Sequence, residues 1–146
     1  MPLKVELKPG ERVIIGKAVI RNGDQRTRFF IEGEAPILRE RDILTAATAV
    51  SPAKKIYLAV QLMYLSGDVA GHQNVYMPLM RDFLAAAPSA LPILDDINNC
   101  ILSDDLYKAL RAAKNLVAYE EDLIAHATDG ERVREGGASH AVAPGA

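Results

Sequence analysis

The pattern of apolar residues changes once along this chain, at Ser51-Pro52. Before this point, segments such as Leu3-Lys4-Val5-Glu6-Leu7 alternate apolar and polar residues, which is the period of a strand with one face in water. After it, apolar residues recur at helical spacing. A serine can accept hydrogen bonds from the first free N–H groups of a helix, and proline suits the first helical position. The sequence therefore predicts strands first and helices second.

The first third is expected to form a small antiparallel sheet. Turn residues at Lys8-Pro9-Gly10-Glu11 follow the first strand, and a run rich in β-branched residues extends from Val13 to Arg21. Asn22-Gly23 is typical of a two-residue hairpin turn, with residues 26–32 as the returning strand. The charged segment 37–44 fits either a last strand or a short helix.

Four helices are expected after Ser51. The first ends at Gly67, and the next two cover residues 71–87, with Pro78 inside, and 91–102. The last begins after Ser103-Asp104-Asp105, and its expected apolar stripe comprises Leu106, Leu110, Ala113, Val117 and Ile124.

Beyond Ala127 the chain is rich in Gly, Ala and Arg and lacks aromatic residues, so a disordered tail is expected. The prediction is an α+β fold: a small N-terminal antiparallel β-sheet, then a helical bundle of about four helices and a disordered tail. The corresponding parts are a β-rich basic lobe at 1–50, a helical lobe at 51–127 and the tail at 128–146. The pattern leaves open whether the first lobe is a separate domain or a sheet packed on the bundle.

Composition indicates a globular cytoplasmic protein. The 146 residues are 49% hydrophobic and 25% charged, within the ordinary range. The single Cys100 cannot pair within the chain, so nothing suggests an oxidising compartment. The N-terminus lacks a signal-peptide pattern, and the most apolar run, Ile56 to Leu65, is far shorter than the roughly 20 residues that span a bilayer. We expect no membrane contact.

The residue types that carry catalysis or bind metal do not cluster in the sequence. The three histidines show no ligand spacing, the carboxylates occur as adjacent residues that diverge on a helix, and Cys100 lies in an apolar run where an inert thiol is expected. These residues are His72, His126 and His140, Asp95-Asp96, Asp104-Asp105 and Glu120-Glu121-Asp122. We expect no enzyme activity, metal or cofactor.

Charge is divided unevenly along the chain. Residues 1–55 carry 11 Lys or Arg against 7 Asp or Glu, whereas residues 56–146 carry 6 against 12. The basic part could bind nucleic acid, or both sets of charges could simply solvate two surfaces. The RNA-binding candidates are Arg12, Lys17, Arg21, Arg26, Arg28, Arg39, Arg41, Lys54 and Lys55.

Phe29 and Phe30 follow Arg28, and aromatic rings beside Arg can stack on bases of single-stranded RNA. Because neighbouring residues on a strand point to opposite faces, one ring must point inward, so one core ring and one partly covered ring is an equal alternative.

The helical half could bind a protein partner. The apolar residues of the first two helices cover a wider face than a narrow packing stripe, and they would suit a surface that adapts to a partner. Core packing is the commoner role of such a stripe. They are Ile56, Tyr57, Val60, Met63, Tyr64, Met77 and Met80.

Several blocks of the chain resemble the FlbT family of flagellar regulators. The resemblance covers about residues 1–125 in a consistent order. The blocks are Met-Pro-Leu-Lys-Val-Glu-Leu-Lys-Pro-Gly-Glu at 1–11, Asn22-Gly23-Asp24, Leu-Arg-Glu-Arg-Asp-Ile at 38–43, Pro-Ala-Lys-Lys-Ile-Tyr at 52–57, Leu-Met-Tyr-Leu at 62–65, Tyr-Lys-Ala-Leu at 107–110 and Tyr119-Glu120.

The resemblance implies a non-enzymatic, cytoplasmic, post-transcriptional regulator of flagellin synthesis. Such a protein would bind the 5′ untranslated region of flagellin mRNA to repress translation or promote decay, alongside FlaF and possibly flagellin as protein partners. Activation in place of repression and a homodimer are left open. The alternative is an adaptor or chaperone for flagellin or FlaF that acts on the mRNA only indirectly.

A shorter segment, Gly10-Glu11-Arg12-Val13-Ile14-Ile15-Gly16, is similar to the Gly-Glu-x-x-x-Ile-Gly segment of the carbon storage regulator family of RNA-binding β proteins. An ordinary strand after a turn accounts for it equally well.

Overall fold

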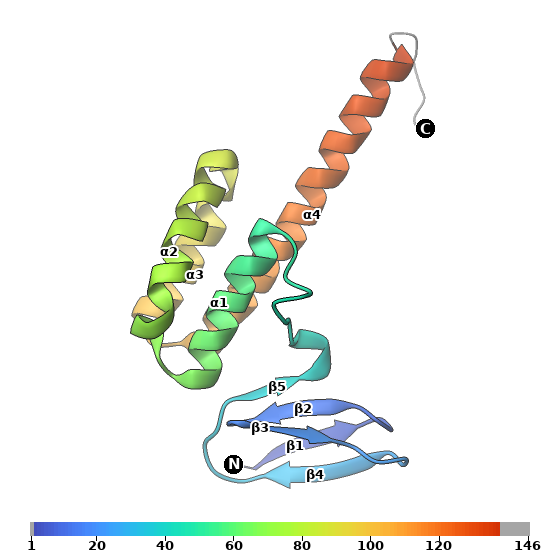
Figure 1. Cartoon of the computed structure of the whole chain (residues 1–146), viewed down its shortest axis with the longest axis vertical. Coiled ribbons are helices and arrows are strands. Elements are labelled where there is room, and N and C mark those ends of the chain that lie inside the picture. The colour runs from blue at the N-terminus through green and yellow to red at the C-terminus, as the bar shows by residue number, and fades with distance from the viewer. Residues whose placement is uncertain (1, 138–146) are drawn as a thin grey trace. The chain divides into compact units, whose positions relative to one another are not determined.

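The computed structural model of the chain describes residues 2–137 (Figure 1). Strands come first and helices follow, so the predicted α+β class is confirmed. The strands are β1 (Leu3–Leu7), β2 (Arg12–Ile15), β3 (Ala18–Arg21), β4 (Thr27–Ile31) and β5 (Ile37–Arg39). The α-helices are α1 (Pro52–Ser66), α2 (Val69–Ala86), α3 (Leu91–Leu102) and α4 (Leu106–Gly137), with short 3-10 helices η1 (Glu40–Asp42) and η2 (Pro88–Ala90).

The chain divides into two compact units, Met1–Leu79 and Met80–Ala146. The first unit contains the strands, α1 and the start of α2, and the second contains the rest of α2 with α3 and α4. Sequence analysis places the lobe boundary at residue 50, where strands give way to helices, whereas the compact units group α1 with the strands.

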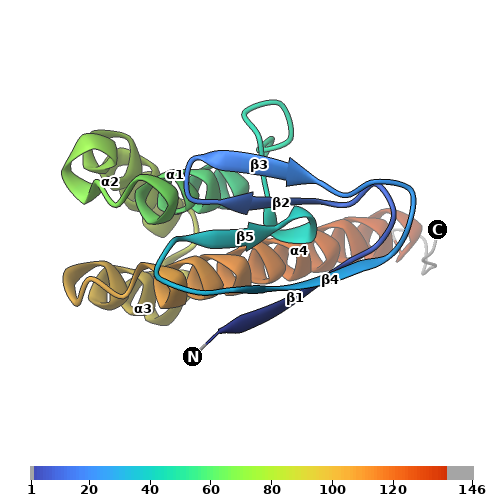
Figure 2. The same ribbon diagram turned by 90° about the horizontal axis from the view of Figure 1, so that it is seen from below.

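The strands form two antiparallel sheets, β3-β2-β5 and β1-β4. In Figure 2 the strands follow one another from top to bottom as β3, β2, β5, β4 and β1. Val5 and Leu7 of β1 and Val13 of β2 are buried in one cluster. Side chains from both sheets pack around it, namely Ile15, Phe29, Ile31 and Ile37. The two sheets are therefore the layers of a small sandwich, and each keeps one face outside it.

The tight hairpin turn lies at Gly16-Lys17. The prediction of a two-residue hairpin turn at Asn22-Gly23 was wrong, because β3 does not pair with β4. β2 pairs with β3 so that Ile15 faces Ala18 across the turn. Gly16 has a φ of 62°, the positive value that a type II′ turn requires at its first central position and that glycine adopts at low cost. A glycine inside the β-branched run was the sequence signal for this turn.

Asn22 instead anchors a longer connection between β3 and β4. Its side-chain amide donates to the carbonyl oxygens of Leu7, Lys8 and Gln25 at 3.1, 2.8 and 2.8 Å. Its Oδ1 accepts from the Gly23 N–H and the Thr27 hydroxyl, at 2.9 and 2.8 Å. One side chain thus ties the end of β1 to the segment that leads into β4.

Segment 37–44 contains both of the elements considered for it, β5 and then η1. Three side chains of α1 bind its backbone. The Tyr57 hydroxyl donates to Asp42 O at 2.6 Å, and the Tyr64 hydroxyl bonds both the N–H and the carbonyl of Ile37. The Gln61 amide accepts from Leu44 N and donates to Leu44 O, both at 2.9 Å. These bonds fix α1 on the β5 side of the first unit.

The predicted ends of α1 are confirmed. The Ser51 hydroxyl accepts from Lys54 N at 3.2 Å, and Gly67 closes the helix with a φ of 71°. Its Met- and Tyr-bearing stripe is interior: Ile56, Tyr57, Val60 and Met63 are buried and Tyr64 is half-buried.

In the second unit, α3 packs along α4, with Leu94, Ile97, Leu110, Ala113 and Leu116 buried. The hydroxyls of Ser89 and Tyr119 hydrogen-bond to each other.

The predicted α4 stripe was wrong at its end, because Ile124 is 57% exposed. α4 continues to Gly137, past the end expected at Ala127, while residues 138–146 of the expected tail lie outside the described residues.

Candidate nucleic-acid interface

Strand alternation and pairing define the outer face of the β1-β4 sheet. Val5, Leu7, Phe29 and Ile31 point into the sandwich core. The intervening residues point outward, and the register pairs Lys4 with Phe30 and Glu6 with Arg28. We call these four outward residues, Lys4, Glu6, Arg28 and Phe30, the Phe30 face.

The two adjacent phenylalanines have different environments. Phe29 packs against the core cluster, whereas the Phe30 side chain is 60% exposed. The structure therefore has one ring in the core, as strand alternation requires. The other ring, Phe30, is more exposed than the partly covered ring that the sequence alternative expected. Phe30 shares its face with Arg28 of the same strand and Lys4 of the neighbouring strand.

Arg12 and Arg21 are direct cross-strand partners at the end of the β2-β3 hairpin away from its turn. Glu40 of η1 accepts from the Arg12 backbone N–H at 2.8 Å and from its Nε at 3.3 Å. These bonds from Arg12 hold the pKa of the Glu40 carboxyl below its usual value. Arg12 is therefore already paired with a carboxylate, which weakens it as a phosphate contact.

The other basic candidates are spread over the first unit. Lys17 lies in the β2-β3 turn, Arg26 before β4 and Arg39 on β5, where it is half-buried. Arg41 Nε lies 3.9 Å from an Asp42 carboxylate oxygen. Lys54 and Lys55 occupy the first turn of α1.

The nine candidates do not share one face. Alternation puts Arg12 and Arg21 on the outer face of the β3-β2-β5 sheet, because Val13 of the same hairpin points into the core. Arg28 lies on the outer face of the other sheet, so it is on the opposite side of the sandwich.

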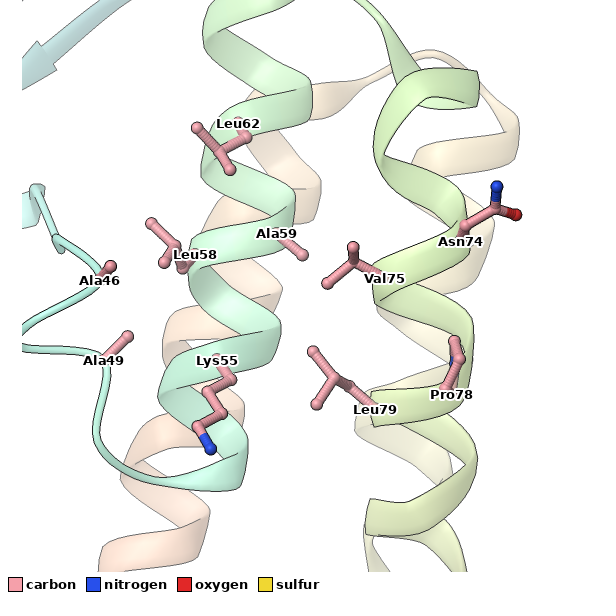
Figure 3. Close-up of a pocket in the computed structure, with 10 residues that line it drawn as sticks. All are labelled: Ala46, Ala49, Lys55, Leu58, Ala59, Leu62, Asn74, Val75, Pro78 and Leu79. Atoms are coloured by element: carbon pink, nitrogen blue, oxygen red, sulfur yellow. The ribbon is translucent and has the colours of Figure 1, made fainter.

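A second feature of the first unit is an apolar groove beside α1, with a volume of about 500 Å³ (Figure 3). Val75 and Leu79 of α2 point toward α1 across it, and Lys55 supplies a charge. The remaining lining residues are Ala46, Ala49, Leu58, Ala59, Leu62, Asn74 and Pro78. We call it the α1–α2 groove.

Among the side chains described, those of residues 2–127, no three His, Cys, Asp or Glu come together as metal ligands. Burial, with Asp96 and Asp105 nearby, raises the pKa of the Cys100 thiol, so the thiol stays protonated at neutral pH and is a poor nucleophile. No helix in this part of the chain is long and apolar enough to cross a membrane.

Lys4 is absent from the candidates predicted from the sequence, and the sequence left open whether Phe29 or Phe30 is the outer ring. The signal was present in the period-two pattern of both strands, which puts Lys4 on the face opposite Leu3, Val5 and Leu7. The α1–α2 groove is also absent from the sequence predictions, because Leu58 and Leu62 lie beside the stripe that was considered.

Comparison with known proteins decides the family. The model of the family described as flagellar protein FlbT matches residues 3–124. The chain belongs to the FlbT family.

Relatives in this family match over most of the chain. A protein of Bradyrhizobium diazoefficiens named probable flagellum biosynthesis repressor protein FlbT 1 is 59% identical over 84% of this chain and 85% of its own. A FlbT protein of Rhodopseudomonas palustris with a corresponding name is 52% identical, covering 85% and 98%. The flagellum biosynthesis repressor protein FlbT of Caulobacter vibrioides is 33% identical, covering 89% and 94%. None of these names is that of an enzyme.

No solved structure matches the chain. The segment similar to the carbon storage regulator family is a strand, β2, between Gly10 and Gly16, which both have positive φ. This geometry is that of an ordinary strand between two turns.

Proposed function

We propose that this FlbT-family protein is a cytoplasmic repressor of flagellum biosynthesis that acts after transcription, by binding the 5′ untranslated region of flagellin mRNA. Binding there would repress translation or promote decay of the message. The names of the relatives support the repressor role. The observation that carries the RNA step is the concentration of all nine basic candidates in Met1–Leu79, against the acidic remainder of the chain.

Arg26 and Arg28 are the best residues for a test, because both are exposed and neither forms an ion pair with the side chains of residues 2–127. The full-length protein is titrated with flagellin leader RNA and with a scrambled RNA of equal length at two salt concentrations. The doubly charge-reversed variant Arg26→Glu, Arg28→Glu should bind the leader more weakly and with a shallower salt dependence, because fewer counterions are released.

The matched control is Arg81→Glu, Arg111→Glu, which makes the same change in net charge at two exposed positions of the acidic unit. It should lower affinity much less. Equal losses in the two variants would mean that only net charge matters, and leader binding no tighter than scrambled binding would remove the proposed function.

The α1–α2 groove favours a second candidate function: an adaptor for FlaF or flagellin that affects the mRNA indirectly. An apolar groove between two helices suits an apolar helical segment of a partner. Val75 is 59% exposed and points across the groove, so Val75→Asp should abolish such a complex while leaving the fold intact. An adaptor complex would also survive nuclease treatment.

A further inference from the structure

Phe30 is the exposed aromatic ring of a charged sheet face. The sandwich core is filled by its neighbour Phe29, so packing does not account for a second phenylalanine that is 60% exposed. Lys4 is the direct cross-strand partner of Phe30, and such pairs have Cβ atoms about 4.5–5.5 Å apart. Arg28 lies two residues earlier on the same face. The ring is thus flanked by a cation from each strand.

The cations of this face are available to a ligand. Neither Lys4 nor Arg28 takes part in a salt bridge within the described part of the chain. Glu6 faces Arg28 across the sheet and puts one carboxylate on the same surface. A ligand that fits must present a flat π surface to Phe30 and negative charge at two places beside it, across the strand pair at Lys4 and along β4 at Arg28. Nucleotides in a strand have this arrangement, because each base is flanked by phosphates.

We propose that Phe30 stacks on an unpaired base of RNA while Lys4 and Arg28 contact the flanking phosphates, so that the Phe30 face selects single-stranded segments of the bound message. The inference rests on the proposed function, because it assumes that the chain binds RNA. Bases in a duplex already have neighbours on both sides and cannot lie on an exposed side-chain ring unless they are unstacked.

The test uses the full-length protein and short RNA oligonucleotides that tile the flagellin leader, each single-stranded or annealed to its complement. Phe30→Ala should weaken single-strand binding roughly 5- to 150-fold, the loss expected when one base–aromatic stack is removed. Phe30→Tyr should restore it, whereas Phe30→Leu should not, because leucine keeps an apolar side chain but has no π face. A fluorescent adenine analogue in the bound oligonucleotide should be quenched by the wild-type ring and not by Phe30→Ala.

The salt dependence of binding distinguishes the contribution of the Phe30 ring from those of the two cations. Phe30→Ala should leave the slope of log affinity against log salt unchanged, since it removes no charge. Lys4→Ala and Arg28→Ala should each reduce that slope by about 0.7, the value for one phosphate contact on a single strand. Glu6→Gln should tighten binding by roughly two- to fivefold, since an exposed repulsive carboxylate is removed.

The outcomes distinguish the inference from the function on which it rests. Discriminating leader binding that is unaffected by Phe30→Ala would overturn the stacking site and leave the proposed function in place. Equal affinity for annealed and single-stranded tiles would do the same. No RNA binding by the wild-type chain would overturn both. Phe30 variants that lose a protein complex but keep leader binding would overturn the stacking site alone.

Discussion

Asn22 is the residue on which the loop between β3 and β4 depends. Its side chain makes five hydrogen bonds, three through Nδ2 and two through Oδ1, to both ends of that loop and to the end of β1. No other natural side chain offers two donors and an amide oxygen in this short geometry. The dipeptide Asn22-Gly23 predicts a local hairpin turn, whereas in the structure the Asn22 side chain connects segments that are distant in the sequence.

Asn22→Ala should lower the free energy of unfolding by about 1–3 kcal/mol, since the hydrogen bonds from its amide to the carbonyl groups of Leu7, Lys8 and Gln25 are lost. Chemical denaturation measures the change. Asp24→Ala, in the same loop and exposed, is the control and should change stability by less than about 0.5 kcal/mol. A similar loss in both variants would contradict a special role for Asn22.

Glu40 gives the first unit a pH dependence. Because Arg12 lowers the pKa of the Glu40 carboxyl in the folded chain, the ionised carboxylate stabilises the fold at pH values above its unfolded-state pKa of 4.5. This contribution should be lost as the pH falls below 4.5 and through the lowered folded-state pKa. Denaturation from pH 7 to pH 3 should show the stability of Glu40→Gln converging with that of the wild type at the acid end. A difference that is constant with pH would refute the linkage.

At the scale of elements, α1 organises the first unit through side chains that bind backbone. Gln61 is buried and satisfies both polar groups of Leu44, while Tyr57 and Tyr64 bind Asp42 and Ile37. The segment they hold, 37–49, includes β5 and the residues Ala46 and Ala49 that form one wall of the α1–α2 groove.

Gln61→Leu should therefore destabilise the chain by about 1–3 kcal/mol and increase amide hydrogen exchange at Leu44, because the partly buried N–H and carbonyl of Leu44 lose their partners. Gln73→Leu makes the same substitution at an exposed site of α2 and serves as the control. Unchanged exchange at Leu44 in the Gln61 variant would show that other contacts hold the segment.

Elements with strong local signals could be predicted from the sequence. Ser51-Pro52 and Gly67 fixed both ends of α1, because capping is decided by residues within one turn. Strand pairing could not be derived, because β1 pairs with β4 across two intervening strands and no local pattern specifies this partner. The Phe30 face depends on that pairing, so Lys4 and Phe30 could not be joined before the register was known.

For the whole molecule, the match to the FlbT family ends at residue 124, and Glu120 is the last buried residue of α4 within residues 106–127. We predict that a chain ending at Ala127 keeps the thermal stability and the leader-RNA affinity of the full chain. Thermal unfolding and RNA titration of the two forms would check this. A large fall in affinity without a change in stability would assign RNA contacts to residues 128–146.

The position of Asn22 also bears on the chemical lifetime of the protein. Asn-Gly sequences deamidate when the glycine nitrogen attacks the asparagine side-chain carbonyl, ammonia leaves, and water then opens the resulting succinimide to a carboxylate. Here the Gly23 N–H is held by Oδ1 and the departing nitrogen, Nδ2, is held by three carbonyl oxygens. Folded chains should therefore deamidate slowly at Asn22. Chains that open at the loop even briefly would acquire a carboxylate facing those carbonyls, so each opening carries a chance of permanent damage.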